Sequence, residues 1–143
     1  MRAFRSIFSG FLIAYGFVAF MCFFGIDSHW IKAAPAEANA ALGLVYRHNE
    51  HGSYTYLSAF QTTALGLLFF TSIPLTFLGA LISPKTNLEF GKFGLSARWD
   101  VDHPRLHAAG MLLGVVGAPL LLFVVGPPLV AALNRGGFML NFG

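Results

Sequence analysis

Two histidines four residues apart, His103 and His107, are side chains of a type and spacing that could do chemistry. Residues at positions i and i+4 share one face of a helix, so the pair could hold a metal ion or supply an axial ligand to a haem or a chlorin. His107 lies deeper in the expected helix and is the better candidate. The alternative is structural, because Asp102 suits a helix N-cap and Pro104 suits a first helical turn.

A second group of possible ligands, His48, Glu50 and His51, lies in the stretch YRHNEHGSY. Imidazoles and a carboxylate can bind zinc or copper, although a solvated loop or a docking surface for a soluble partner explains the same residues. A b-type haem inside a helical bundle usually needs two facing histidines. The threading predicted below puts the two histidine groups on opposite sides of a membrane, so a haem or pigment on His107 would have to be shared with another subunit.

The sequence carries no motif typical of an enzyme. It has one cysteine, Cys22, and therefore neither a disulfide framework nor a CxxC site. It also lacks a nucleophile elbow, a P-loop, a GxGxxG turn and an HExxH helix. We therefore expect the chain not to be catalytic by itself.

The composition is that of a membrane protein. Of the 143 residues, 56% are hydrophobic and 10% are charged, whereas a soluble domain usually carries about 25% charged residues. A bilayer is crossed by roughly 20 apolar residues, and three uncharged runs meet or approach this length, at residues 7–26, 57–82 and 108–126. The sequence therefore predicts an all-α integral membrane protein, a single membrane domain with three transmembrane helices.

The ends of the first and third runs need separate interpretation. Residues 126–128 read Gly-Pro-Pro, and paired prolines remove two helix donors, so we expect the third helix to stop or bend near residue 126. Residues 127–143 would then form an interfacial tail. The first run exceeds the about 7 to 15 apolar residues of a signal peptide, and it is interpreted as an uncleaved signal anchor.

Basic residues predict the orientation, because Lys and Arg are retained mainly on the cytoplasmic side of a membrane. An N-in, C-out orientation puts six of them inside and three outside. The inner set is Arg2, Arg5, Lys85, Lys92, Arg98 and Arg105, and the outer set is Lys32, Arg47 and Arg135. Residues 27–56 then form an outer loop with an amphipathic surface helix, and residues 83–107 form a cytoplasmic loop. Anionic lipid heads account for the basic excess, so no nucleic-acid partner is expected.

Small and hydroxyl-bearing residues predict the faces by which the helices pack, because apolar side chains gain little by leaving acyl chains for one another. The predicted rows are Ser6, Gly10 and Ala14 on the first helix, Thr62, Gly66, Ser72, Thr76 and Ala80 on the second, and Gly110, Gly114 and Gly117 or Ala118 on the third. The alternative is that such residues are common in any membrane helix. No ionisable residue other than Cys22 and Tyr15 lies inside the predicted spans, which argues against a pump or an ion-coupled transporter.

Two functional hypotheses follow. In the first, the protein is a non-catalytic accessory or scaffold subunit of a larger complex, an electron-transfer assembly of respiratory or photosynthetic type in a bacterial inner membrane. Its partners are then other integral membrane subunits and structural lipids. In the second, it is a small membrane anchor that binds haem, quinone or pigment through His107 or His103. An uncoupled channel or a lipid-modifying enzyme is a third alternative.

Overall fold

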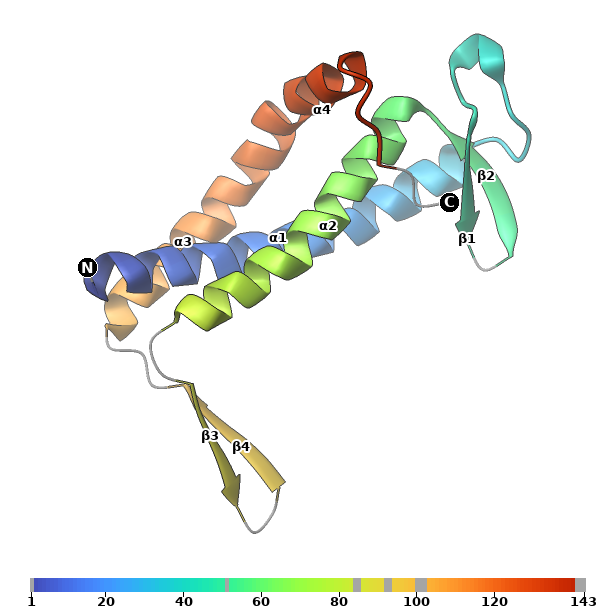
Figure 1. The fold of residues 1–143 in the computed structure, drawn as a ribbon. Helices are drawn as coiled ribbons and strands as arrows, with labels where there is room; N and C mark the ends of the chain where they lie inside the picture. The colour runs from blue at the N-terminus through green and yellow to red at the C-terminus, as the bar shows by residue number, and fades with distance from the viewer. Residues whose placement is uncertain (1, 51, 84–85, 92–93, 100–102, 141–143) are drawn as a thin grey trace. The chain divides into compact units, whose positions relative to one another are not determined.

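The structure is a computed structural model that describes residues 2–50, 52–83, 86–91, 94–99 and 103–140, with the backbone alone described at residues 50, 86–91 and 94–99. Its elements are α1 (Arg2–Ala33), η1 (Ala40–Leu42), β1 (Tyr46–Glu50), β2 (Ser53–Leu57), α2 (Ala59–Ile82), β3 (Thr86–Gly91), β4 (Gly94–Trp99), α3 (Pro104–Leu120), η2 (Leu121–Val125) and α4 (Gly126–Arg135) (Figure 1). Three continuous helices, Arg2–Ala33, Ala59–Ile82 and Pro104–Arg135, are long and apolar enough to cross a membrane. The prediction of three such helices is therefore confirmed.

α1 extends beyond the predicted span at both ends. The polar residues before residue 7 and after residue 26 stay helical, and the helix ends at Ala33, two residues before Pro35. A proline disfavours helical backbone at the residue before it, so Pro35 is the first strong stop signal in this part of the chain. Hydropathy marks the part of a helix that suits lipid, whereas the backbone signals decide where the helix ends.

The third helix was predicted to stop or bend near residue 126, and it does not stop there. Residues 121–125 form the π-helical turn η2, in which the Gly126 N–H donates to the Leu121 carbonyl five residues back. Pro127 and Pro128 then occupy the first turn of α4, where a missing N–H costs a helix least. The π turn thus resets the hydrogen-bond register, and the chain stays helical to Arg135.

The prediction of a surface helix in the first loop was also wrong. Between the end of α1 at Ala33 and the start of α2 at Ala59, the only helical piece among the described residues is η1, which is three residues long. The Leu42 N–H donates to Asn39 Oδ1 at 3.2 Å at its start, and Gly43 ends it with a left-handed φ of 68°. A single turn between two such signals cannot grow into an amphipathic helix.

The described residues form two β-hairpins, in the segments 27–56 and 83–107 that were predicted as loops. β1 pairs antiparallel with β2 from Tyr46↔Leu57 to Glu50↔Ser53, in segments whose aromatic and β-branched residues favour strands. The Gly52 N–H donates to Asn49 Oδ1 at 3.1 Å in the turn. β3 and β4 pair antiparallel inside the predicted loop 83–107, from Thr86↔Trp99 to Gly91↔Gly94. The chain is therefore mostly helical rather than all-α.

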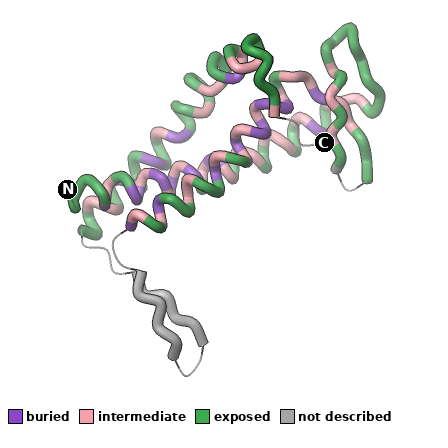
Figure 2. Tube along the Cα trace, viewed as in Figure 1, coloured by how far each residue is buried: buried purple, intermediate pink, exposed green. Residues whose placement is uncertain are grey.

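The chain divides into two compact units, and each takes part of all three long helices. Unit 1 comprises Met1–Val18 and Ser72–Ala118, and unit 2 comprises Ala19–Thr71 and Pro119–Gly143. Figure 2 shows their buried residues along the helices. The buried residues described in unit 1 are Ser6, Ser9, Gly10, Leu12, Ala14, Gly16, Ser72, Gly79, Ser83, Gly110, Gly114 and Ala118. All except Leu12 are Gly, Ala or Ser, so unit 1 packs largely backbone against backbone.

Unit 2 packs through larger side chains. Leu57 and Leu65 are almost fully buried there, and the Thr63 hydroxyl donates to Asn134 Oδ1 at 2.7 Å between α2 and α4. α2 begins with a capping box, in which the Gln61 N–H donates to Ser58 Oγ at 3.2 Å and the Ser58 N–H donates to Gln61 Oε1 at 2.9 Å. The hydrogen bond from Thr63 to Asn134 ties α4, the helix that continues past the prolines, to the first turns of α2.

Candidate functional site

The candidate ligand His107 lies where the first turns of α3 meet the start of α1. Its Nδ1 is 3.2 Å from the Ser6 carbonyl oxygen, and the residue is half-buried. A carbonyl oxygen can only accept, so Nδ1 carries the proton of this bond, and in the neutral ring Nε2 is then the nitrogen that presents a lone pair. Imidazoles that bind metals are commonly oriented in this way by a backbone carbonyl. The same contact also serves as a hydrogen bond between two helices.

Two glycines allow α1 and α3 to come close enough for this contact. A Cβ on Gly110 would overlap the Ile7 carbonyl oxygen, and a Cβ on Gly10 would overlap the His107 carbonyl oxygen. Each helix thus places a glycine against a carbonyl of the other, the geometry in which Cα–H groups meet carbonyl oxygens. Farther along, a Cβ on Gly114 would lie 2.6 Å from the Phe11 carbonyl oxygen. The backbones are in contact over two turns.

The predicted rows on α1 and α3 face each other in this contact. The structure also decides between Gly117 and Ala118, which were predicted as alternatives on α3. Ala118 is fully buried, whereas Gly117 is half-exposed and a Cβ there would meet only Phe11 Cε2 at 3.7 Å. Positions 110, 114 and 118 have the same spacing of four as positions 6, 10 and 14 on α1. Rows with this spacing form one ridge along a helix, and Gly117 lies beside the ridge.

A second packing face of α1, toward α2, was missed in the sequence. The buried Ser9 hydroxyl donates to the Gly79 carbonyl at 2.8 Å. Two turns along, a Cβ on Gly16 would lie 2.6 Å from the Ser72 carbonyl oxygen and would overlap Thr76 Oγ1. The sequence feature that could have revealed this face is the spacing of seven between two small residues, Ser9 and Gly16, which places them on one side of a helix.

The predicted row on α2 is divided between the two units. Ser72, Thr76 and Ala80 belong to unit 1, where Ser72 is buried and the Thr76 hydroxyl donates to its carbonyl at 2.9 Å. Thr62 and Gly66 belong to unit 2, where Thr62 is buried and a Cβ on Gly66 would lie 2.5 Å from Leu140 Cβ. The row therefore does not contact one single neighbour.

The second predicted ligand, His103, is exposed immediately before α3, and its carbonyl accepts from the His107 N–H at 2.9 Å. Pro104 is the first residue of α3, as expected of a first-turn proline, while Asp102 lies outside the described residues. His107 is thus the better enclosed of the two imidazoles.

The predicted metal ligands of the first loop are only partly described. His48 Nε2 lies 3.8 Å from Asp27 Oδ1, an ion-pair distance when the imidazole is protonated. The side chain of Glu50 and all of His51 lie outside the described residues. Within the described part of the chain, no group of three or more His, Cys, Asp or Glu side chains could hold a metal ion. The contact between His48 and Asp27 was not predicted from the sequence.

No protein-family model, no curated protein sequence and no solved structure matches this chain. What the protein does must therefore be inferred from its own residues and contacts. The contacts described above comprise one oriented imidazole and two narrow small-residue faces on α1.

Proposed function

We propose that the protein is a non-catalytic subunit of a larger membrane complex and that other integral membrane subunits dock on α3. The observation that carries the proposal is how little of the third long helix its own chain covers. In the most apolar window of Pro104–Arg135, 17% is buried, against 33% for Arg2–Ala33. The side chains Leu112, Leu113, Val115 and Val116 are exposed beside the narrow glycine face of α3. Most of the circumference of α3 is therefore available to lipid or to another helix.

The orientation and the kind of complex belong to the same proposal. We place the N-terminus on the cytoplasmic side and the C-terminus outside, because six of the nine basic residues then lie inside. We assign the complex to the electron-transfer assemblies of a bacterial inner membrane. What supports the assignment is the oriented imidazole of His107, since such assemblies bind their tetrapyrroles through histidine.

Co-purification tests this proposal. The full chain, extracted in a gentle detergent, is expected to retain integral membrane partners in fixed ratio, as identified by mass spectrometry. Tryptophan at the exposed positions Leu112 and Val116 is tolerated by lipid but obstructs a docking helix, so L112W/V116W should lower the retained partner about tenfold. Tryptophan at the exposed Phe17 of α1 is the matched control and should leave the yield unchanged. A chain that purifies alone, or an equal loss with F17W, contradicts docking on α3.

A second candidate function is that His107 holds the metal of a haem or pigment, and the bond from Nδ1 to the Ser6 carbonyl favours it. The bond orients the ring and leaves Nε2 as the ligand atom. The complex should then absorb in the Soret region, and His107→Ala should abolish the part of the band that belongs to this chain. His103→Ala is the matched control, because that imidazole is exposed at the helix start. An unchanged spectrum in His107→Ala, with the partners retained, excludes this role.

A further inference from the structure

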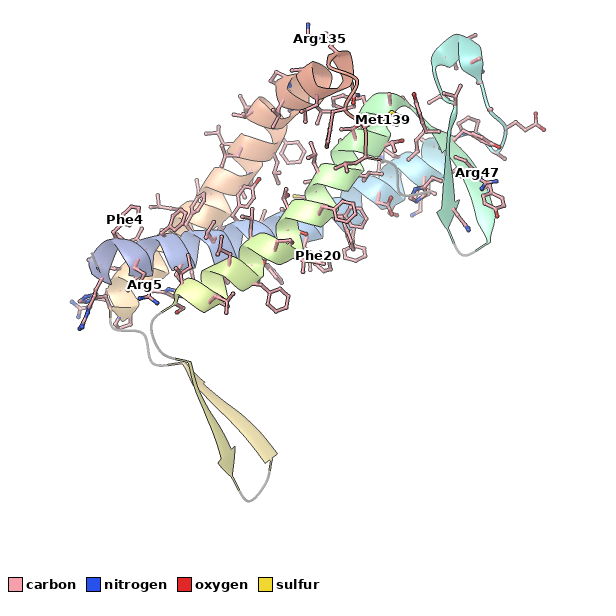
Figure 3. All side chains as sticks on the ribbon, viewed as in Figure 1. Phe4, Arg5, Phe20, Arg47, Arg135 and Met139 are labelled. Carbon is pink, nitrogen blue, oxygen red and sulfur yellow. The ribbon has the colours of Figure 1, made fainter. Side chains whose placement is uncertain are left out.

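Three exposed arginines gather at the end of unit 1 where α1 begins, α2 ends and α3 begins. Arg2 and Arg5 lie in the first turns of α1, and Arg105 lies in the first turn of α3. Two contacts join these helix ends. The Arg5 Nε–H donates to the Ile82 carbonyl at 2.6 Å, and His107 Nδ1 donates to the Ser6 carbonyl. Figure 3 shows Arg5 directed toward the end of α2.

The Arg5 guanidinium is held in a fixed place by this bond. The Ile82 carbonyl is one of the last carbonyls of α2, which have no donor within the helix. Because Nε is committed to it, the two terminal nitrogens of the guanidinium remain available to a second acceptor. A guanidinium presents its donors as a rigid fork that matches the oxygens of a phosphate.

An exposed apolar surface begins immediately beside these cations. Phe4 is 71% exposed and stacks on Phe8, with ring centroids 5.8 Å apart and planes 9° apart. Leu81, one residue before the carbonyl that Arg5 holds, is also exposed. Cations at the helix ends are thus followed along the helices by exposed apolar side chains. A phospholipid has the matching arrangement, with a charged phosphate at one end and acyl chains next to it. A soluble phosphate would use the cations alone.

Unit 2 has no comparable excess of positive charge. Its segments contain the basic residues Lys32, Arg47 and Arg135 and the acidic residues Asp27, Glu37 and Glu50, three of each. The Arg47 guanidinium lies 4.7 Å above the Tyr54 ring, and the Arg135 Nε–H donates to the Ala131 carbonyl. The segments of unit 1 contain six basic residues against Glu89, Asp100 and Asp102. Among the side chains that the structure describes, unit 1 therefore has three cations, Arg2, Arg5 and Arg105, and no carboxylate.

We propose that Arg2, Arg5 and Arg105 form a binding site for the phosphate of an anionic phospholipid, with its acyl chains along Phe4 and Phe8. The site rests on the proposed insertion in a membrane, but not on a partner subunit. If net charge alone attracted anionic lipids, all basic residues would contribute alike. The proposed site assigns this attraction to three particular arginines.

Native mass spectrometry of the full chain tests the site, with phosphatidylglycerol and phosphatidylcholine as the probe lipids. The unchanged protein should retain phosphatidylglycerol preferentially. R2Q/R5Q/R105Q should weaken its binding about fivefold for each charge removed, and the matched triple K32Q/R47Q/R135Q should keep it. Arg105→Gln alone provides the test if the triple variant does not fold, because no hydrogen bond of the Arg105 side chain is seen in the described structure. Phe4→Ser should lower the binding of phosphatidylglycerol with every charge in place.

Three results would overturn the site. Equal losses in the two triple variants would show that net charge, not a site, attracts the lipid. Full retention by R2Q/R5Q/R105Q would show that other residues bind it. Displacement of the lipid by millimolar inorganic phosphate would identify a soluble anion as the ligand. Failure of the membrane proposal looks different, because then neither lipid is retained by any variant.

Discussion

Gly110→Leu is expected to separate α3 from α1 and to destabilise the protein by about 3 kcal/mol. A Cβ at this position would overlap the Ile7 carbonyl oxygen and lie 2.8 Å from the Ile7 carbonyl carbon and 2.9 Å from its Cα. These are backbone atoms of a helix, so they cannot turn aside as a flexible side chain can. The whole of α3 must move outward, and the His107 to Ser6 contact is lost with it.

The matched control is Gly117→Leu, which makes the same change on the same helix. There a Cβ would meet only Phe11 Cε2, at an ordinary 3.7 Å, so we expect a change below about 0.5 kcal/mol. The free energy of unfolding can be measured in mixed micelles by titrating the helical circular dichroism signal with a denaturing detergent. Equal effects at the two positions would contradict the contact between α1 and α3.

Gly16→Leu should destabilise the protein by about 2 kcal/mol, through the other face of α1. A Cβ there would lie 2.6 Å from the Ser72 carbonyl oxygen and 2.9 Å from the Thr76 amide nitrogen, and it would overlap Thr76 Oγ1. The Thr76 hydroxyl can rotate away, whereas the Ser72 carbonyl belongs to the backbone. The expected cost is therefore somewhat smaller than at Gly110.

Gly25→Leu is the control for this face, since it lies on the same helix and a Cβ there has nothing within 4 Å. It should leave the denaturation midpoint unchanged under the same conditions. Loss of stability at Gly110 but not at Gly16 would show that α1 packs on α3 without packing on α2. That result would contradict the face formed by Ser9 and Gly16.

Besides marking small residues as candidate packing faces, the sequence by itself determined the three long helices. Hydropathy marks them because a backbone in lipid must satisfy its hydrogen bonds within the helix, and this requirement depends on each segment alone. The spacing of four that links Ser6 to Gly10 and Gly110 to Gly114 also lies within single helices. The surface helix predicted in the loop 27–56 does not form, because the capping by Asn39 and the turn at Gly43 outweigh the helix-forming alanines near them.

Only the tertiary structure decided which faces meet and what they position. Ser9 donates to Gly79, His107 to Ser6 and Thr63 to Asn134, and the members of each pair are 70 or more residues apart. The choice of Ala118 over Gly117 and the continuation of the third helix past Pro127 and Pro128 likewise depend on the spatial structure. A pattern along one helix shows that a face is suited to close packing. Which carbonyl of which other helix it meets depends on the approach of two backbones, which no single segment encodes.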